Sequence, residues 1–200
     1  MDYYIVSMKL WTYYYARVKD LPKNVLPVAI SLSVPPRWPF PVYKKLAPSQ
    51  IWFWDLKDYE GEDKTEIYIK RYNDTVLSKL TQEEVYKDLK EMLDSENKKN
   101  EQHYDYIALI CFEKSDNFCH RHLFSNWFSC HGFGTCEEFS LKDYKMFEFL
   151  NLVESYEKEL LTFDDQENLV IGRDPEEDGC YLTLRIRPNR LLFSKEDPLL

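Results

Sequence analysis

Two nearly continuous apolar runs stand out along a chain whose remaining segments are mixed. They cover residues 26–32 (LPVAISL) and residues 106–112 (YIALICF). Apolar runs of this length are typical of strands that are covered on both faces, as in a parallel sheet. We therefore predict strands over residues 26–32 and 105–112, and a shorter opening strand over residues 2–9. Residues 12–20 show no clear periodicity of apolar positions and could begin a helix or form a loop.

Helical spacing follows between the two runs. Residues 65–80 carry apolar side chains at mostly helical intervals, which predicts a helix. Thr81 begins a second helix, because Glu84 stands three residues later and completes a capping box. Residues 94–102 are polar and predict a loop. A third helix is expected over residues 117–129, started by Asp116 or Asn117 and ended by Gly132 and Gly134.

The character of the chain changes after Ser140. Residues 146–156 predict a helix, and residues 168–172 and 180–187 predict a β-hairpin around an acidic turn at 174–179. We therefore predict an α/β fold, a three-layer sandwich with a mainly parallel sheet over residues 1–140. Residues 141–200 are expected to form an acidic C-terminal extension with a helix and a β-hairpin.

Charge is unevenly distributed along the chain. The formal net charge is -9, but residues 1–57 are net basic and all later segments are net acidic. Long-range attraction to nucleic acid is therefore weak or local, and nucleic acid is not the expected partner. Aromatic residues, Tyr15 and Trp38 among them, interleave with the basic residues of the first third. Such a surface could stack a nucleotide base, or the aromatic residues could simply pack.

The composition also bears on location. No run of about 18 apolar residues is present, so we expect no membrane-spanning helix. The first residues lack the basic and apolar regions of a signal peptide. Five cysteines without disulfide spacing fit a reducing compartment, and we predict a cytoplasmic protein without membrane contact.

The most informative segment for function is residues 113–122 (EKSDNFCHRH), which follow the second apolar run. Ligands in α/β sheets bind at the carboxyl ends of strands, beside helix N-termini. A thiol at a helix start near a cation has a lowered pKa, so Cys119 is a candidate nucleophile with His120 or His122 as acid or base. Alternatively, the same N–H groups and Arg121 could hold a phosphate, or all of these residues could be structural.

A metal site is not predicted. Cys119 and His122 share a helix face, but a structural zinc site needs a second close pair, and Cys130 and Cys136 are too widely spaced to supply it. Cys111 is expected to be buried in its strand. No Walker, Rossmann or HExxH motif is present, and five glycines exclude a glycine-rich phosphate loop. No cofactor is therefore expected.

One specific feature of the chain is the strand followed by Glu113-Lys114 and by Cys119-His120-Arg121. The supporting segments are residues 12–16, 21–22, 26–32, 43–48, 68, 72 and 76–80. Together these segments resemble a known family, the bacterial, archaeal and phage family called domain of unknown function 488. The resemblance covers about residues 1–140. It implies a three-layer α/β fold with a mainly parallel sheet and places Cys119, His120 and Arg121 in the family's motif.

These observations lead to one main hypothesis and two alternatives. The main hypothesis is a domain that binds a phosphorylated small ligand, most simply a nucleotide, at the start of the helix at Cys119–His122. Arg121 would hold the anion, Tyr15 and Trp38 would stack on a base, and Lys44 or Lys45 would meet phosphate. Whether Cys-dependent chemistry follows is left open. The alternatives are a phage or mobile-element factor that binds a host protein through residues 141–200, and a nucleic-acid accessory protein.

Overall fold

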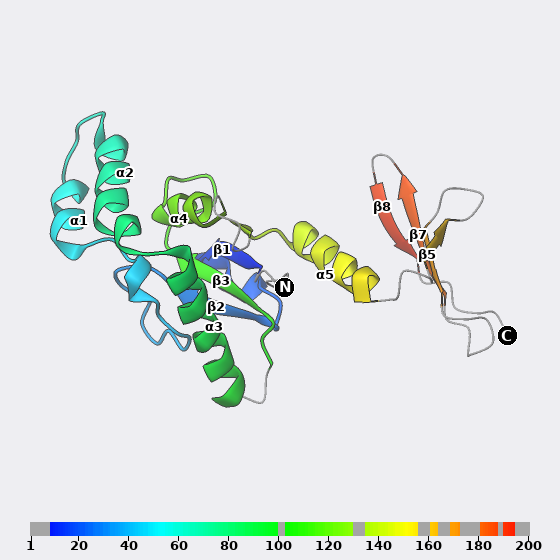
Figure 1. Cartoon of the computed structure of the whole chain (residues 1–200). Coiled ribbons are helices and arrows are strands. Elements are labelled where there is room, and N and C mark those ends of the chain that lie inside the picture. Colours follow the sequence, from blue (N-terminus) through cyan, green and yellow to red (C-terminus); the bar gives the residue numbers. More distant parts are fainter. Residues whose placement is uncertain are drawn as a thin grey trace. The chain divides into compact units, whose positions relative to one another are not determined.

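The computed structural model describes residues 9–99, 103–129, 135–155, 161–163, 169–172, 181–187 and 190–194. The chain divides into two compact units, Met1–Ser140 and Leu141–Leu200 (Figure 1). None of the helices in the described ranges has both the length and the apolar character that a membrane-spanning helix requires.

A four-stranded parallel sheet forms the centre of the first unit. Its strands, in the order β2-β3-β1-β4, are β1 (Leu10–Tyr14), β2 (Val25–Ala29), β3 (Tyr106–Cys111) and β4 (Cys136–Glu138). All five residues of β2 are buried, as are the last five of β3. The two apolar runs therefore form buried strands, β2 at one edge of the sheet and β3 beside it, and the prediction of an α/β fold with a mainly parallel sheet is confirmed.

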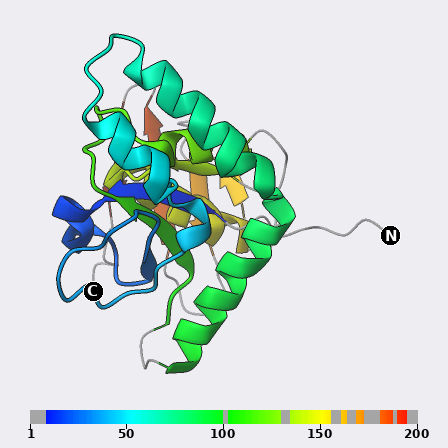
Figure 2. The ribbon, with the colours of Figure 1, turned by 90° about the vertical axis from the view of Figure 1, so that its left-hand side faces the viewer.

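Four α-helices contribute to one apolar core on one face of this sheet. They are α1 (Gln50–Lys57), α2 (Lys64–Thr75), α3 (Gln82–Lys99) and α4 (His120–Ser129). Figures 1 and 2 show α1, α2 and α3 on the same side of the strands. The sheet supplies side chains that share a face by register, such as Leu10, Leu26 and Ile107. The helices supply buried residues such as Leu89 and Phe124.

The opposite face of the sheet carries a smaller aromatic group. Phe139, just after β4, packs edge-on against Trp11 with ring centroids 5.6 Å apart, and against Tyr13 at 5.2 Å. Its backbone N–H donates to the carbonyl of Thr12. Edge-to-face contacts of this kind add stabilisation beyond the area that they bury, so they hold the short strand β4 against β1.

The second helix of the sequence prediction begins as expected. The Thr81 backbone N–H donates to Glu84 Oε2 at 3.0 Å, and the Glu84 N–H donates to Thr81 Oγ1 at 3.2 Å. This reciprocal pair is the predicted capping box. The helix, α3, continues to Lys99, so the prediction of a polar loop is wrong over residues 94–99, and residues 100–102 lie outside the described residues. The amide of Asn97 exchanges two hydrogen bonds with the backbone of Tyr104, which stabilises this last turn.

Three further elements differ from the predictions. The opening strand is Leu10–Tyr14, not residues 2–9, and residues 2–8 lie outside the described residues. Helix α1 was not predicted. Its apolar residues Ile51 and Trp54 are exposed to solvent, so the apolar positions of this segment do not form a regular helical pattern. Helix α4 begins at His120 rather than near residue 117, since Asn117 lies in a turn closed by its N–H and the Lys114 carbonyl. Gly132 and Gly134 lie outside the described residues.

The second unit contains one helix and an antiparallel sheet. Helix α5 spans Leu141–Ser155, slightly earlier than predicted. Four strands follow in the order β5-β6-β7-β8, namely β5 (Leu161–Phe163), β6 (Leu169–Gly172), β7 (Tyr181–Arg187) and β8 (Arg190–Ser194). The antiparallel pairing of β6 with β7 matches the predicted hairpin, whose turn lies outside the described residues. The short strands β5 and β8 were not predicted.

Candidate functional site

The candidate site lies where β2 and β3 end side by side. Cys111 is the last residue of β3, and the chain then turns and enters α4 at His120. Ile30 follows β2 directly, and its N–H donates to the carbonyl of Ile110. Parallel pairing thus brings the carboxyl ends of both strands next to the start of α4, the place where α/β sheets bind their ligands.

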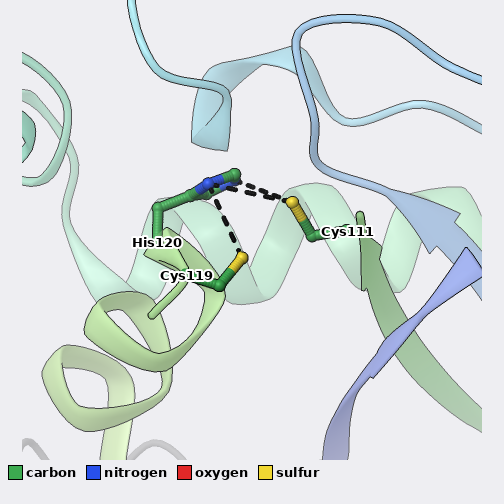
Figure 3. Close-up of side chains that lie close together, drawn as sticks. All are labelled: Cys111, Cys119 and His120. Carbon is green, nitrogen blue, oxygen red and sulfur yellow. Dashed lines mark hydrogen bonds between the residues drawn. The ribbon is translucent and has the colours of Figure 1, made fainter. Parts of the chain in front are cut away.

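Three side chains converge at this point (Figure 3). The sulfur of Cys111 lies 3.8 Å from both ring nitrogens of His120, and the sulfur of Cys119 lies 4.0 Å from Nδ1. The donor atoms of all three residues lie within 4.8 Å of one another. Cys111, Cys119 and His120 are 4–5% exposed, so the cluster is shielded from bulk water.

A hydrogen bond to the backbone places a proton on one ring nitrogen of His120. Nε2 lies 3.1 Å from the carbonyl oxygen of Ile30, and a carbonyl can only accept, so Nε2 carries a proton. Nδ1 lies 3.3 Å from the hydroxyl of Tyr68 and faces the two sulfurs. Nδ1 is therefore directed into the cluster, 3.8 Å from the sulfur of Cys111 and 4.0 Å from that of Cys119.

The pKa values of the two cysteines are shifted in opposite directions. A hydrogen bond from the Cys111 thiol, helped by His120 and by the backbone N–H of Arg121, outweighs burial and lowers the pKa of Cys119. The same contact, together with burial, raises the pKa of Cys111 well above its ordinary value. Cys119 occupies the N-cap position of α4, where a side chain accepts from the first free N–H groups. The contacts of this pair therefore favour the thiolate at Cys119 and the thiol at Cys111.

A cavity of about 190 Å³ opens onto the cluster. Five aromatic residues line it, and three of these are substantially exposed at its rim: Trp54, Phe112 and Phe118. The lining otherwise consists of Ser31, Leu32, Ser33, Pro48, Glu113 and the three cluster residues. No lysine or arginine is among these lining residues. The cavity is therefore suited to a flat apolar group, with the thiolate of Cys119 at its floor.

Arg121 lies beneath the site with its guanidinium bound to protein atoms. It is fully buried, donates from Nε and Nη2 to the two carboxylate oxygens of Glu138 at 3.1 and 3.2 Å, and donates from Nη1 to the Glu113 carbonyl at 2.6 Å. An anion could reach this guanidinium only by displacing Glu138. The geometry makes Arg121 a clamp that ties the turn before Cys119 to strand β4.

His122 faces the same carboxylate and not the cysteine cluster. Its Nε2 lies 3.4 Å from Glu138 Oε2, and Thr12 and Ser115 donate to Glu138 at 2.7 and 2.8 Å. Burial alone would raise the pKa of Glu138, but these hydrogen bonds outweigh it and lower the pKa to about 2. Glu138 is therefore a partly buried structural anion.

Tyr15 and Trp38, which the sequence predicted to stack on a base, do not line the cavity. Tyr15 and Trp38 contact each other edge-to-face with centroids 4.9 Å apart, and Tyr15 also contacts Phe112 at 4.6 Å. The hydroxyl of Tyr15 shares a 2.7 Å hydrogen bond with Ser31. Both rings support the loop after β2, and a stacking role for them stays a prediction.

The two lysines are engaged elsewhere. Lys44 donates to the carbonyls of Ser31 and Leu32, with 2.9 Å to the first. Lys45 forms an ion pair with Asp88 at 2.7 Å. Both line a wider groove of about 740 Å³ between residues 39–45 and α3, not the cavity above the cluster. The structure thus brings together Cys119 and His120, while Arg121, His122, Lys44 and Lys45 lie outside the cavity.

Sequence reasoning missed two residues of the site. Cys111 ends an apolar strand and was interpreted as core, although its position at the carboxyl end of a central strand is the available signal. Tyr68 lies on α2, far away in sequence, and only the fold brings its hydroxyl to His120. The cluster has two chemical options, because a thiolate acts as a nucleophile or as a metal ligand.

Comparison with known families gives one result. The model of DUF488-N3a, described as the active DUF488-N3 subclade, matches residues 27–132, which include β3 and the start of α4. No curated protein and no solved structure matches the chain.

Proposed function

The chain belongs to the DUF488 family, and from the geometry of its cavity we propose that it binds a small ligand of the nucleotide class and presents the ligand's ring to Cys119. The observation that carries this proposal is that Cys119 lines an aromatic cavity, and the contacts around its sulfur lower its pKa. The word active in the description of the matched subclade agrees with a reactive centre. The five cysteines show no disulfide spacing, which supports a location in the reducing cytoplasm.

The size of the cavity limits which part of a ligand it encloses. Pockets for drug-sized ligands usually measure about 300–1,000 Å³, and this cavity is about 190 Å³. It therefore holds a single ring system, while the remainder of the ligand lies at the open mouth. Trp54, Phe112 and Phe118 stand at this mouth and offer stacking surfaces, which bind any base through its π face.

The charges around the cavity favour the ring over the phosphate as the anchoring group. The cavity lining contains no lysine or arginine, and Glu113 is its one carboxylate. Arg121 is occupied by Glu138, and Lys44 by two backbone carbonyls. A phosphate would gain little here, so the proposed ligand binds through its base or a similar flat ring. Phosphate, where present, extends toward solvent.

Ligand binding can be tested with defined probes. The shift in melting temperature is measured with adenosine, guanosine, cytidine and thymidine and with their 5′-monophosphates. We expect at least one base to stabilise the protein, with nucleoside and monophosphate giving similar shifts. Labelling of Cys119 by iodoacetamide is measured in parallel, and a bound base should slow it. A protein that none of the eight compounds stabilises or protects would contradict the proposal.

Two variants serve as the matched pair for this test. Cys119→Ser removes the thiolate at the cavity floor and leaves a side chain of similar shape, so ligand binding persists while thiol-dependent labelling disappears. Lys45→Met removes a cation that lies outside the cavity, and its thermal shifts should equal those of the native protein. A loss of ligand binding in Lys45→Met would place the ligand in the other groove.

A further inference from the structure

The Cys111, Cys119 and His120 side chains form a donor set with a clear chemical preference. Two sulfurs and one imidazole nitrogen are soft to borderline ligands, which select zinc over the hard ions magnesium and calcium. They come from the end of β3 and the start of α4, two elements fixed by the sheet and by the Arg121 clamp. The three residues are buried, so ligand exchange with bulk solvent is limited.

The separations between donor atoms approach those of a zinc site. With Zn–S bonds of ~2.3 Å and Zn–N bonds of ~2.0 Å, tetrahedral geometry places two sulfurs ~3.8 Å apart and sulfur and nitrogen ~3.5 Å apart. The observed distances from His120 Nδ1 are 3.8 Å to Cys111 Sγ and 4.0 Å to Cys119 Sγ, and all donor atoms lie within 4.8 Å. Side-chain movements of up to about one ångström would bring all donor atoms to these separations.

The orientation of His120 is the second, independent observation. A histidine that binds a metal through one nitrogen usually donates the other N–H to a carboxylate or a backbone carbonyl, which fixes the ring. Here Nε2 donates to the Ile30 carbonyl at 3.1 Å, and Nδ1 is left facing the sulfurs. Because β2 and β3 pair in parallel, the outer partner of the imidazole is held by the same sheet as Cys111.

Among the described residues the cluster has three members, and all three also line the aromatic cavity. Structural zinc sites are closed by four protein ligands, whereas sites with three protein ligands keep a position for water or substrate. The fourth position here would face the cavity, near the hydroxyl of Tyr68.

We propose that Cys111, Cys119 and His120 bind one Zn²⁺ ion with its fourth position open to the aromatic cavity. Binding releases the Cys111 thiol proton to solvent, so that two thiolates and one neutral imidazole surround the ion. The inference rests on the proposed function only for the occupant of the open position, a heteroatom of the bound ring.

The test measures metal binding by the full chain directly. The protein is stripped with a chelator, dialysed and titrated with Zn²⁺ against a chromophoric competitor, and Co²⁺ is added separately as a spectroscopic probe. We expect one tight Zn²⁺ per chain and, with Co²⁺, an intense near-ultraviolet thiolate-to-metal band. Cys111→Ser, Cys119→Ser and His120→Gln should each weaken Zn²⁺ binding by at least about a hundredfold, since each removes one of three ligands.

The matched control is a Cys130→Ser/Cys136→Ser double variant. It removes the two neighbouring cysteines and keeps the cluster, so its Zn²⁺ affinity and Co²⁺ band should be those of the native chain. Loss of the band in this control would overturn the assignment of the ligands. A native chain that gives no thiolate-to-Co²⁺ band and takes up no tight Zn²⁺ would overturn the proposal itself, even if a cluster variant fails to fold. If the metal-free chain is still stabilised by a nucleoside, the proposed function stands even though the zinc proposal fails.

Discussion

Arg121 and Glu138 form an ion pair with two parallel hydrogen bonds, between the second residue of α4 and the last residue of β4. The arginine is fully buried, and its remaining contact is the carbonyl of Glu113 in the turn that leads to Cys119. Two-pronged arginine–carboxylate pairs combine strength with a fixed geometry. The pair therefore connects the edge of the sheet to the segment that carries the thiolate.

Breaking this pair should be costly. Glu138→Gln leaves a buried guanidinium without its counter-charge, and removal of one partner of a buried pair costs about 3–5 kcal/mol of stability. We expect a loss of about 3 kcal/mol in the free energy of unfolding measured with urea. Glu137→Gln, at the neighbouring exposed position, is the control and should change it by less than about 0.5 kcal/mol. Equal effects of the two substitutions would contradict the clamp.

The same carboxylate predicts how stability depends on pH. Because the pKa of Glu138 is lowered to about 2 in the folded protein, from an unfolded value near 4.5, its contribution is present above about pH 4.5 and is lost as pH falls toward 2. The stability difference between the native chain and Glu138→Gln should therefore be largest near neutral pH and shrink across this interval. A difference that stays constant from pH 6 to about pH 2.5 would show that the carboxylate carries no such charge.

The lowered pKa of Cys119 predicts its reactivity. A free thiol loses about tenfold in alkylation rate for each pH unit below about 8.5, because only the thiolate reacts. Cys119 stays deprotonated, so its rate with iodoacetamide should change little from about pH 8 to about pH 5. Peptide mapping by mass spectrometry provides an internal comparison. Burial raises the pKa of Cys136 to about 12, so Cys136 should stay unlabelled in the folded chain.

The strands β2 and β3 and the start of α3 could be predicted from the sequence, because buried apolar strands and capped helices leave local signals. Residues 26–32 and 106–112 are apolar at nearly every position, and the Thr81–Glu84 box marks a helix start by itself. β1 left no such signal, since Thr12 breaks its apolar pattern. That hydroxyl is buried because it donates to Glu138, a residue 126 positions away. Helix α1 escaped prediction because Ile51 and Trp54 are exposed.

The site was predictable only in part for a similar reason. Cys119 and His120 could be identified because they follow a buried strand at a helix start. The burial of Arg121 depends on Glu138, and β4 was not predicted, so the arginine was interpreted as a free anion ligand. Cys111 carries no local mark that separates a packed thiol from a functional one. Long-range pairs such as Tyr68 with His120 exist only once α2 packs beside α4.

Lys44 offers a way to separate support of the site from phosphate binding. It donates to the carbonyls of Ser31 and Leu32, and both residues line the cavity. Lys44→Met should loosen this loop and weaken binding of a nucleoside and of its 5′-monophosphate by the same factor. A direct phosphate contact would instead weaken only the monophosphate. Isothermal titration with the base that gives the largest thermal shift distinguishes the two results, and Lys45→Met is the control.

The aromatic rim predicts the last result. Trp54 and Ile51 lie on the same short helix α1 and are both exposed, but only Trp54 lines the cavity. Stacking of a base on an aromatic side chain contributes about 1–3 kcal/mol, so Trp54→Ala should weaken nucleoside binding by roughly tenfold or more, whereas Ile51→Ala should leave it unchanged. Both substitutions remove an exposed apolar side chain, so a general loss of helix stability would affect them alike. Equal affinities in the two variants would place the ring away from the rim, and a selective loss in Trp54→Ala would locate it beside Cys119.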